Sequence, residues 1–468
     1  MKLTFWGAAR TVTGSKHLLT TDKGKQILLD CGMYQGMGQD SEILNSHWGF
    51  LPENIDYVIL SHAHIDHTGL LPKLVKDGFK GKIFATGGTI DLCEIMLLDS
   101  AHIQESDIKY VNRRKKEKNQ DLIEPLYAEE DAVETLTRFV ELPLNGTLKI
   151  DDEVTVSTFE NGHILGSVAL FLELTKPDDS IIKLTFTGDI GRLSDAILNG
   201  PIDFPQSDYI ICESTYGDRL HEPQGDVEGH LLRIVNQTCV VQRGKIIIPA
   251  FSVDRTQEIV YALDRLAFEG KLPLIDVFVD SPLSVKATRV MAAHREYFNK
   301  DILEYITKDG DPFGFPNLHY VQTADDSKKI NDSKKPCIII SASGMAEAGR
   351  VKHHIKNNIE NPQNTILLVG YASPDSLAGR LKNGEKEVRI FGDTFKVLAT
   401  VESMENYSAH GDYNEMMDYL SCQDIPKVKK IILVHGEFKT QAAWAEKLEV
   451  QGFKNIAIPE LGEEMELI

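Results

Sequence analysis

Three histidines and one aspartate lie within six consecutive positions, and this cluster limits what the chain can be more than any other feature. The run Ser61-His-Ala-His-Ile-Asp-His67 follows an apolar stretch at 57–60 and precedes another at 69–71. The chain holds 15 histidines in 468 residues, so chance rarely places three of them so close together. Imidazole and carboxylate groups are ligands for borderline divalent cations such as zinc. The cluster therefore predicts a metal site on a loop after a buried strand, in preference to a solvated polar loop.

The spacing within the cluster predicts two sets of ligands. His62 and His64 alternate with Ala63, so both side chains can point the same way from an extended loop. Asp66 and His67 then lie on the turn into a helix, where they could face a second metal. One loop does not complete either set, so further ligands must come from elsewhere in the chain.

Two isolated residues are candidates for the missing ligands. His163 lies between two predicted strands in Asn161-Gly-His-Ile-Leu-Gly-Ser167, and Asp189 ends an apolar strand in Thr187-Gly-Asp-Ile-Gly191. Taken singly, the histidine is explained as a core residue and the aspartate as a turn former. Beside the cluster at 62–67, both become candidate metal ligands.

The pattern of apolar residues predicts an α/β chain. In the first 205 residues, strands with several hairpin connections are covered by helices at 87–102 and 129–140. The strands expected there are 27–30, 57–60, 82–85, 154–159, 168–174 and 181–187.

The middle of the chain repeats strand, polar loop and helix three times, with strands at 245–248, 274–279 and 337–340. Such units build a parallel sheet whose loops gather at the carboxyl edge of the strands, where ligands usually bind. Residues 395–401, 431–434 and a helix from 438 are expected to return to the style of the first part. We therefore expect three segments, which are 1–205, a second α/β domain at 206–395, and 396–468 as the completion of the first domain.

Composition excludes several classes of protein. Hydrophobic residues make up 42% and charged residues 26%, as in an ordinary globular chain. Fifty basic and 70 acidic residues give 50 − 70 = −20, which excludes a generally basic nucleic-acid coat but not a local basic cleft. The six cysteines form no CxxC pair and favour buried thiols. Without a signal peptide or a run of about 18 apolar residues, we expect a cytoplasmic protein that does not contact a membrane.

In their order along the chain, the motifs resemble those of the metallo-β-lactamase superfamily. The cluster at 62–67, His163 and Asp189 match its ligand motifs, and Asp30 in Leu28-Leu-Asp-Cys-Gly32 matches a supporting carboxylate. Later motifs resemble those of the β-CASP branch, whose members are nucleases acting on RNA or DNA, including RNA-processing nucleases of bacteria and archaea related to the cleavage-and-polyadenylation endonuclease. These are motif A at 212–217 with Glu213, motif B from Tyr407 to Asp412 with His410, and motif C at 433–437 with His435.

The resemblance covers nearly the whole chain and implies a fold and a set of ligands. The fold is a four-layered αββα sandwich interrupted by an inserted α/β cap with a parallel sheet. Two zinc ions are implied, with Asp189 bridging them. One zinc is held by His62, His64 and His163, and the other by Asp66, His67 and His435.

The activity implied is that of a zinc-dependent ribonuclease, which hydrolyses phosphodiester bonds of single-stranded RNA internally, from the 5′ end, or both. A hydroxide bridging the two zinc ions is the nucleophile, because bound metal lowers the pKa of water. His410 is the general acid, and Glu213 orients it and raises its pKa. The catalytic residues are thus Asp66, Asp189, Glu213 and His410. Family analogy also suggests a homodimer.

Contacts with the phosphate chain are expected from the middle domain and from Ser408, two residues before His410. The segment 341–350 resembles the family's loop of small residues before a helix, where backbone N–H groups can approach a phosphate. The basic run at 109–118 is better explained as a solvated helix face, although it could guide a phosphate chain. The residues expected to contact phosphate or RNA are Ser343, Gly344, Arg350, His353 and Ser408, with His354 as the alternative to His353.

Other functions remain open from the sequence alone. The same scaffold could hydrolyse DNA or a small ester or lactone, but the cap and motifs A to C argue against a small substrate. A non-catalytic subunit of a processing complex is a different alternative, and the complete set of seven ligands argues against it. His435 favours RNA, because DNA-directed members of the family tend to carry an apolar residue at motif C.

Overall fold

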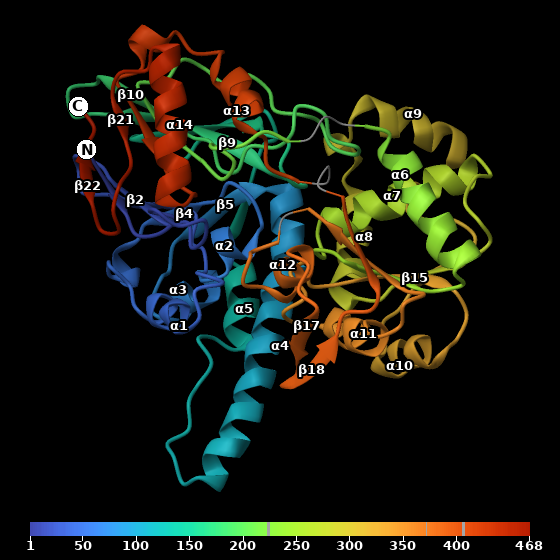
Figure 1. Cartoon of the computed structure of the whole chain (residues 1–468). Helices are drawn as coiled ribbons and strands as arrows, with labels where there is room; N and C mark the ends of the chain where they lie inside the picture. The colour runs from blue at the N-terminus through green and yellow to red at the C-terminus, as the bar shows by residue number, and fades with distance from the viewer. Residues whose placement is uncertain (222–224, 371, 405–407) are drawn as a thin grey trace. The chain divides into compact units, whose positions relative to one another are not determined.

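The structure, a computed structural model, describes residues 1–221, 225–370, 372–404 and 408–468 (Figure 1). Its packing divides the chain into two compact units. Unit 1 contains Met1–Asp195, Asn199–Leu220 and His410–Ile468, and unit 2 contains Ala196–Leu198 and His221–Ala409. The chain therefore leaves unit 1 and returns to it, as an inserted domain requires. Tyr407 of motif B lies outside the described residues.

Unit 1 is built on two seven-stranded sheets (Figure 1). In spatial order, the first sheet consists of β22 (Glu464–Glu466), β1 (Lys2–Phe5), β2 (His17–Thr20), β3 (Gln26–Leu29), β4 (Tyr57–Ile59), β5 (Lys82–Thr86) and β6 (Phe139–Leu142). The second consists of β21 (Ile456–Ala457), β20 (Lys430–Leu433), β11 (Tyr209–Cys212), β10 (Ile181–Phe186), β9 (Val168–Thr175), β8 (Val154–Glu160) and β7 (Thr147–Lys149).

The two sheets of unit 1 pack face to face around one apolar core. Buried and half-buried residues alternate along β8, which is the pattern of a strand with one face in a core. Side chains from both sheets meet in this core, among them Phe5, Leu29, Leu172 and Ile211. The alternation fixes the register of the strands, because a slip by one residue would turn the apolar side chains to the opposite face.

Helices cover the outer faces of both sheets. On the second sheet, Met416 and Trp444 pack with Ile210 and Leu433. On the first sheet, α4 contacts β5 and β6, and α5 packs on α3 and α4. The four-layered αββα sandwich is thereby confirmed. The helices of unit 1 are α1 (Gln39–Ser46), α2 (Ile65–Thr68), α3 (Leu71–Lys76), α4 (Gly87–Glu117), α5 (Glu129–Leu136), α13 (Tyr413–Leu420) and α14 (Phe438–Gln451).

Unit 2 has a six-stranded sheet in which all neighbouring strands are parallel, as predicted. Its spatial order is β14 (Leu318–Tyr320), β13 (Asp276–Val279), β15 (Cys337–Ser341), β12 (Ile246–Pro249), β16 (Thr365–Val369) and β19 (Thr400–Met404). A separate hairpin pairs β17 (Glu387–Ile390) with β18 (Asp393–Lys396). The helices are α6 (Val227–Val235), α7 (Arg255–Phe268), α8 (Pro282–Ala293), α9 (Lys300–Asp309), α10 (Ala324–Asp332), α11 (Arg350–Asn358) and α12 (Leu377–Lys382).

Two elements differ from the sequence-based expectation. The helix predicted at 87–102 continues to Glu117, although its buried residues end at Ala101, because helix-forming polar residues follow the last buried turn. The stretch at 395–401 was expected to return to the first domain, but Thr400–Met404 forms β19 and pairs with β16 of unit 2. Apolar periodicity predicts that a segment forms a strand, but it does not predict which strand that segment pairs with.

The domain boundaries at 205/206 and 395/396 follow the family's segments and remain a prediction. The boundaries between the two compact units of the structure lie after Leu220 and after Ala409. Among the described residues, no helix combines the length and the apolar character that crossing a membrane requires.

Candidate metal centre

The candidate ligands lie at the ends of strands of unit 1. The loop after β4 carries the cluster at 62–67, and α2 begins within it at Ile65. Strands β10, β11 and β20 are parallel neighbours, so their carboxyl ends share one edge of the second sheet. Asp189, Glu213 and His435 follow these three strands and are brought together at that edge.

Three imidazoles and one carboxylate form the first ligand set. Nδ1 of His64 lies 3.1 Å from Nε2 of His62 and 3.1 Å from Nε2 of His163. Oδ2 of Asp189 lies 3.5 Å from Nε2 of each of these two histidines. Ligands at 2.0–2.1 Å in a tetrahedral zinc site stand roughly 3.3 Å apart, so this spacing fits such a site.

A second set faces the other oxygen of Asp189. Nε2 of His67 lies 3.2 Å from Nε2 of His435 and 3.4 Å from Oδ1 of Asp189. Oδ2 of Asp66 lies 3.4 Å from Nε2 of His435. The two oxygens of Asp189 thus face different histidine sets, which is the geometry of a bridging carboxylate.

Asp189 supplies an independent sign that the site is built for a cation. Its Oδ1 is buried and accepts no hydrogen bond from the described residues. A buried carboxylate oxygen without a donor is costly unless a cation lies beside it. Five imidazoles and two carboxylates are a nitrogen and oxygen donor set that suits zinc. The residues present therefore fit two zinc ions.

Contacts behind the ligands orient the imidazoles. Oδ2 of Asp30, a fully buried carboxylate, lies 2.6 Å from Nδ1 of His67, and this carboxylate also accepts hydrogen bonds from the backbone and hydroxyl of Ser61. The Thr215 hydroxyl lies 2.9 Å from Nδ1 of His435. Such outer contacts fix the ring and select the nitrogen offered to a metal. No role was predicted for Ser61 or Thr215 from the sequence, where the only signal for either was a hydroxyl group beside a motif residue.

Backbone conformation at the site is unusual at Asp30, at His435 and at Gly188. Asp30 has a φ of 58° and His435 a φ of 53°, in the left-handed region that non-glycine residues rarely occupy. Gly188, directly before Asp189, has a φ of 56°, and a Cβ there would lie 2.6 Å from Cβ of Ser61. Glycine at 188 therefore allows the Asp189 loop to approach the Ser61 loop closely.

The charges of the cluster reinforce one another. Burial opposes ionisation of Asp189, but His435, His67 and His62 outweigh it and hold the pKa of this carboxyl well below its usual range. Burial also opposes the charged form of His67 and would lower its pKa. The neighbouring carboxylates of Asp189, Asp30 and Asp66 outweigh burial and raise this pKa well above its usual value. For His64, burial dominates and lowers the pKa to about 4. His64 is therefore neutral near pH 7, whereas His67 would have to give up a proton to bind a metal.

Beside the two ligand sets lies a histidine–glutamate pair. Nδ1 of His410 is 3.2 Å from both carboxylate oxygens of Glu213, which also accept hydrogen bonds from the backbone N–H groups of Ile190 at 2.5 Å and Thr215 at 3.2 Å. The His410 ring lies 4.5 Å from that of His163, centre to centre. Burial opposes its protonation, but Glu213 outweighs this, and the pKa of His410 rises to about 9. This pair can therefore hold a proton next to the ligand sets.

The expected phosphate contacts lie in unit 2, where four of the five surround the loop before α11. The Arg350 guanidinium forms an ion pair with Asp280 at 2.6 Å and also donates to the Gln322 carbonyl oxygen at 2.6 Å. His353 is exposed and its ring lies 4.5 Å from that of Phe391. His354, the alternative to His353, is fully buried, with Nε2 2.6 Å from Asp280, so it does not suit a phosphate contact.

The other three expected contacts are small residues. The Ser343 hydroxyl faces Ala348, and a Cβ on Gly344 would lie 2.8 Å from the Phe251 ring. Ser408 is buried. RNA contacts by all five residues remain a prediction. Asp280, which also accepts from Ser327 at 2.5 Å, joins α10 and α11.

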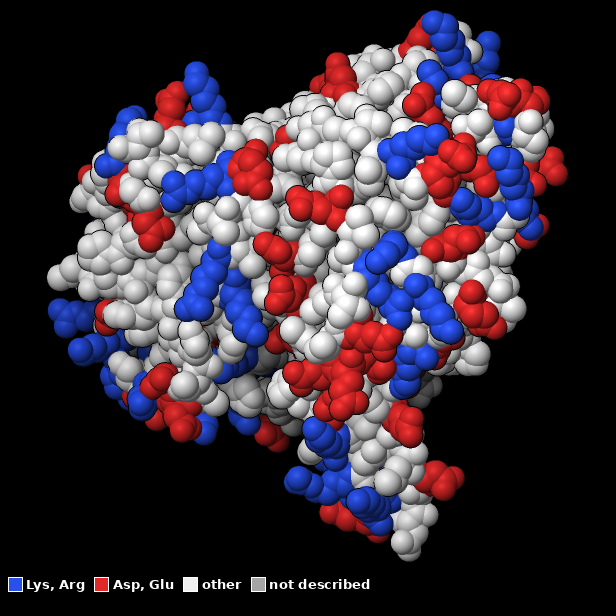
Figure 2. All heavy atoms as spheres, turned by 180° about the vertical axis from the view of Figure 1, so that it is seen from behind, with Lys and Arg blue, Asp and Glu red and all other residues white. Residues whose placement is uncertain are grey.

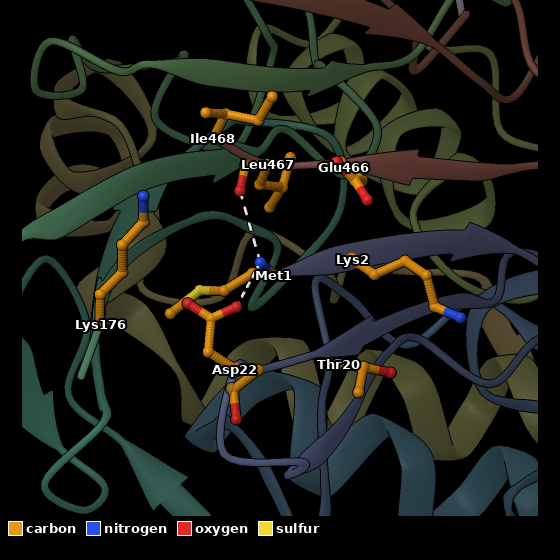
Figure 3. A pocket seen from close by; sticks show the side chains of 9 residues that line it. Met1, Lys2, Thr20, Asp22, Lys176, Glu466, Leu467 and Ile468 are labelled. Atoms are coloured by element: carbon orange, nitrogen blue, oxygen red, sulfur yellow. Dashed lines mark hydrogen bonds and ion pairs between the residues drawn. The ribbon is translucent and has the colours of Figure 1, made fainter.

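One pocket lies away from these residues. It is an open cavity of about 480 Å³ where the two chain ends of unit 1 meet, lined by Met1, Asp22, Lys176 and Leu467 among others (Figure 3). The Met1 ammonium donates to Asp22 at 2.6 Å and to the Leu467 carbonyl oxygen at 3.4 Å. These contacts tie the two ends together and provide none of the chemistry of the ligand sets.

Comparison with known families assigns three parts of the chain. Residues 15–84 match the metallo-beta-lactamase superfamily, residues 256–381 the Beta-Casp domain, and residues 394–459 the Zn-dependent metallo-hydrolase RNA specificity domain. The motifs at 62–67 and His435 fall within the first and third matches, and Arg350 and His353 within the second.

Three relatives are similar over most of this chain. Ribonuclease TTHA0252 of Thermus thermophilus is 31% identical over 99% of both chains. The RNase J-like protein of Methanocaldococcus jannaschii is 31% identical over 93% of this chain and 92% of its own. Transcription termination factor FttA of Methanosarcina mazei is 30% identical over 94% of this chain and 67% of its own. The chain therefore belongs to the β-CASP branch of the metallo-β-lactamase superfamily, a branch of metal-dependent hydrolases.

Proposed function

We propose that the protein is a ribonuclease that uses two zinc ions to hydrolyse phosphodiester bonds in single-stranded RNA. The observation that carries this proposal is the pair of ligand sets facing the two oxygens of Asp189, with His410 and Glu213 beside them. One ligand set consists of His62, His64 and His163, and the other consists of Asp66, His67 and His435.

The chain's own residues have separate tasks in this reaction. When bound, zinc would supply a hydroxide nucleophile near neutral pH and would offset the charge of the reacting phosphate. Asp189 and Asp66 would supply carboxylate ligands at the two metal positions, and Asp30 keeps the His67 ring oriented. His410 would give a proton to the leaving 3′ oxygen. Because its Nδ1 faces Glu213, Nε2 is the ring nitrogen that would deliver this proton.

RNA is favoured as the substrate by the relatives and by the C-terminal match. Two of the relatives are named ribonucleases, and residues 394–459 match a domain named for RNA specificity. Ser343, Gly344, Arg350, His353 and Ser408 are proposed to contact the phosphate chain. A homodimer is a separate proposal, which sedimentation of the purified protein would test.

A cleavage assay on 5′-labelled single-stranded RNA tests the proposal. Wild type is compared with Asp189→Ala and His410→Ala, and the zinc content of all three is measured. We expect cleavage by the wild type with about two zinc ions bound. Both variants should lose activity by about 10²-fold or more, with zinc reduced in Asp189→Ala and retained in His410→Ala. A zinc-loaded wild type that leaves RNA intact would refute the proposal, and the fragment ladder would separate internal cutting from trimming.

A further inference from the structure

Beyond Ala101, helix α4 runs through solvent without a hydrophobic core. The buried residues of α4 end at Ala101, and no residue from His102 to Glu124 is buried. The helix nevertheless continues to Glu117, and the chain after it returns toward α5, so that this part of unit 1 forms a projection (Figure 1). We call residues 102–124 the arm. Because the arm buries no core, the stability of the fold does not explain it.

The arm has a defined shape despite its exposure. The Asn112 side chain donates to the carbonyl oxygen of Ile123 at 2.8 Å and accepts from the backbone N–H of the same residue at 3.0 Å. The Lys115 ammonium donates to the carbonyl oxygen of Asp121 at 3.1 Å. These bonds hold the returning segment against the helix, so the arm presents its side chains on an ordered scaffold.

Cations dominate the distal half of α4. From Lys109 to Lys118 there are six basic residues and one acidic residue, whereas the rest of the arm adds four acidic residues and no Lys or Arg. Figure 2 shows Lys and Arg side chains gathered on this projection, with Asp and Glu side chains beside them. Lys109, Arg113 and Lys116 are spaced i, i+4 and i+7 and share one face of the helix. Among the described residues, Lys109 alone of the six forms an ion pair with a carboxylate, that of Glu105. The helix dipole accounts for cations in the last turn but not for this longer row.

An exposed aromatic ring lies among these cations. Tyr110 is 55% exposed, and the Arg114 guanidinium lies 4.7 Å from the centre of its ring. Sites for single-stranded nucleic acid combine cations along the phosphates with aromatic rings on which bases stack. The arm offers both kinds of group on one surface.

We propose that the arm is a second binding site for single-stranded RNA, outside the metal centre, which holds the substrate chain while it is cut. This inference rests on the proposed ribonuclease function. With a net charge of −20, the protein as a whole repels a polyanion, so a local cationic surface decides where RNA binds.

The start of α4 sets the distance that a bound RNA must span. The hydroxyl groups of Thr86 and Thr89 donate to the carbonyl oxygen of Gly166, in the loop that carries His163, at 2.5 and 2.9 Å. Lys109 follows the first helical residue, Gly87, by 109 − 87 = 22 residues, or about 33 Å of helix. A stacked strand covers that length in about ten nucleotides. Only longer RNAs are therefore expected to engage both sites.

The test compares two variants that each lose three positive charges. The arm variant carries Arg113→Gln, Arg114→Gln and Lys116→Gln, because glutamine preserves helix propensity. The control carries Lys23→Gln, Lys80→Gln and Lys454→Gln, three exposed lysines elsewhere on unit 1. Both are made in a His410→Ala background to prevent cleavage. Fluorescence anisotropy measures binding of single-stranded RNAs of about 30 and about 5 nucleotides, above and below the span, over a range of salt concentrations.

We expect the arm variant to bind the long RNA about tenfold or more weakly, with a salt slope shallower by about 2, since each lost contact contributes about 0.7. The control should match the parent on both RNAs, and Arg113→Lys with Arg114→Lys should retain long-RNA binding. Equal affinities of the arm and control variants for the long RNA would overturn the proposal, whether both fall or neither does. Since this assay measures binding, it still tests the arm if the wild type fails to cleave RNA, a failure that would count against the proposed function alone.

Discussion

At the scale of single residues, contacts behind His67 and His435 set which ring nitrogen each imidazole offers. Asp30 holds Nδ1 of His67 and Thr215 holds Nδ1 of His435, so Nε2 of each ring faces the other ligands. A carboxylate behind a histidine also makes the ring a stronger ligand. We therefore expect Asp30 to affect metal binding without being a ligand itself.

Replacing Asp30 tests this role. Asp30→Asn keeps the size of the side chain but removes its charge, and we expect a 10- to 100-fold loss of zinc affinity, the usual effect of such outer contacts. Competition with a fluorescent chelator measures the affinity. Asp264→Asn is the matched control, because Asp264 is also a buried carboxylate but belongs to unit 2 and faces Tyr305. Equal losses in the two variants would assign the effect to general instability.

The Glu213–His410 pair predicts a pH dependence. A general acid must be protonated, so the rate falls as pH rises through the pKa of His410, which Glu213 raises against the effect of burial to about 9. Glu213→Gln removes the carboxylate and lowers this pKa, so the alkaline limb of the kcat profile should move to lower pH. Bound zinc would lower the pKa in both proteins and leave the direction unchanged. An unmoved alkaline limb, with Glu446→Gln on the exposed face of α14 as control, would assign that limb to another group.

The residue pattern allowed part of the site to be predicted. The cluster at 62–67 is visible in the sequence because four donors share one loop, and His163 and Asp189 are candidates beside it. His435 came only from the resemblance. The roles of Thr215 and Asp280 could not be predicted in the same way. A threonine or an aspartate makes such contacts only once the fold brings distant segments together, and neither belongs to a local pattern of donors.

At the scale of elements, the start of α13 positions the loop that carries His410. Asp412 caps this helix, and its Oδ1 accepts from the backbone N–H groups of Asn414 at 2.9 Å and Glu415 at 3.1 Å. Glu415 accepts in return from the Asp412 N–H at 3.0 Å and pairs with Arg192 at 2.9 Å. The backbone N–H of Gly411 donates to the Ile190 carbonyl oxygen at 2.8 Å, next to Asp189.

This cap gives a prediction about stability. Asp412→Ala should lower the free energy of unfolding by about 1 kcal/mol, because it leaves two N–H groups at the helix start without an acceptor. Asp412→Asn should keep most of the stability, since asparagine is an equally good cap. Urea denaturation followed by circular dichroism measures both. If the two variants are equally unstable, the charge of Asp412 matters more than the cap.

The differences between predicted and observed elements have physical causes. The helix at 87–102 was predicted from residues that face the core, so the prediction ended where burial ends, near Ala101. The solvated part of α4 carries no apolar periodicity to detect. Similarly, β19 is visible in the sequence as a strand, but its pairing with β16 depends on packing between segments far apart in the chain.

At the scale of the whole molecule, the seven proposed ligands would couple a bound metal to the fold of unit 1. They span residues 62 to 435 and come from both sheets, whereas unit 2 contains none of the seven. Such a site forms only when unit 1 is folded, so metal binding stabilises this unit by mass action. Zinc at 100 times its Kd contributes about 2.7 kcal/mol for one site.

Removal of zinc should therefore act on one unit. Dialysis against a chelator is expected to lower the melting temperature of unit 1 by about 5 °C or more, at 2–4 °C for each kcal/mol. Hydrogen exchange resolved by peptides assigns the effect, because peptides of unit 1 should lose protection while those from the unit 2 sheet keep it. Asp189→Ala lacks the bridging carboxylate and should respond much less to the chelator. Equal loss of protection in both units would mean that they unfold together, and no loss in either would mean that the seven ligands do not bind metal tightly enough to stabilise the fold.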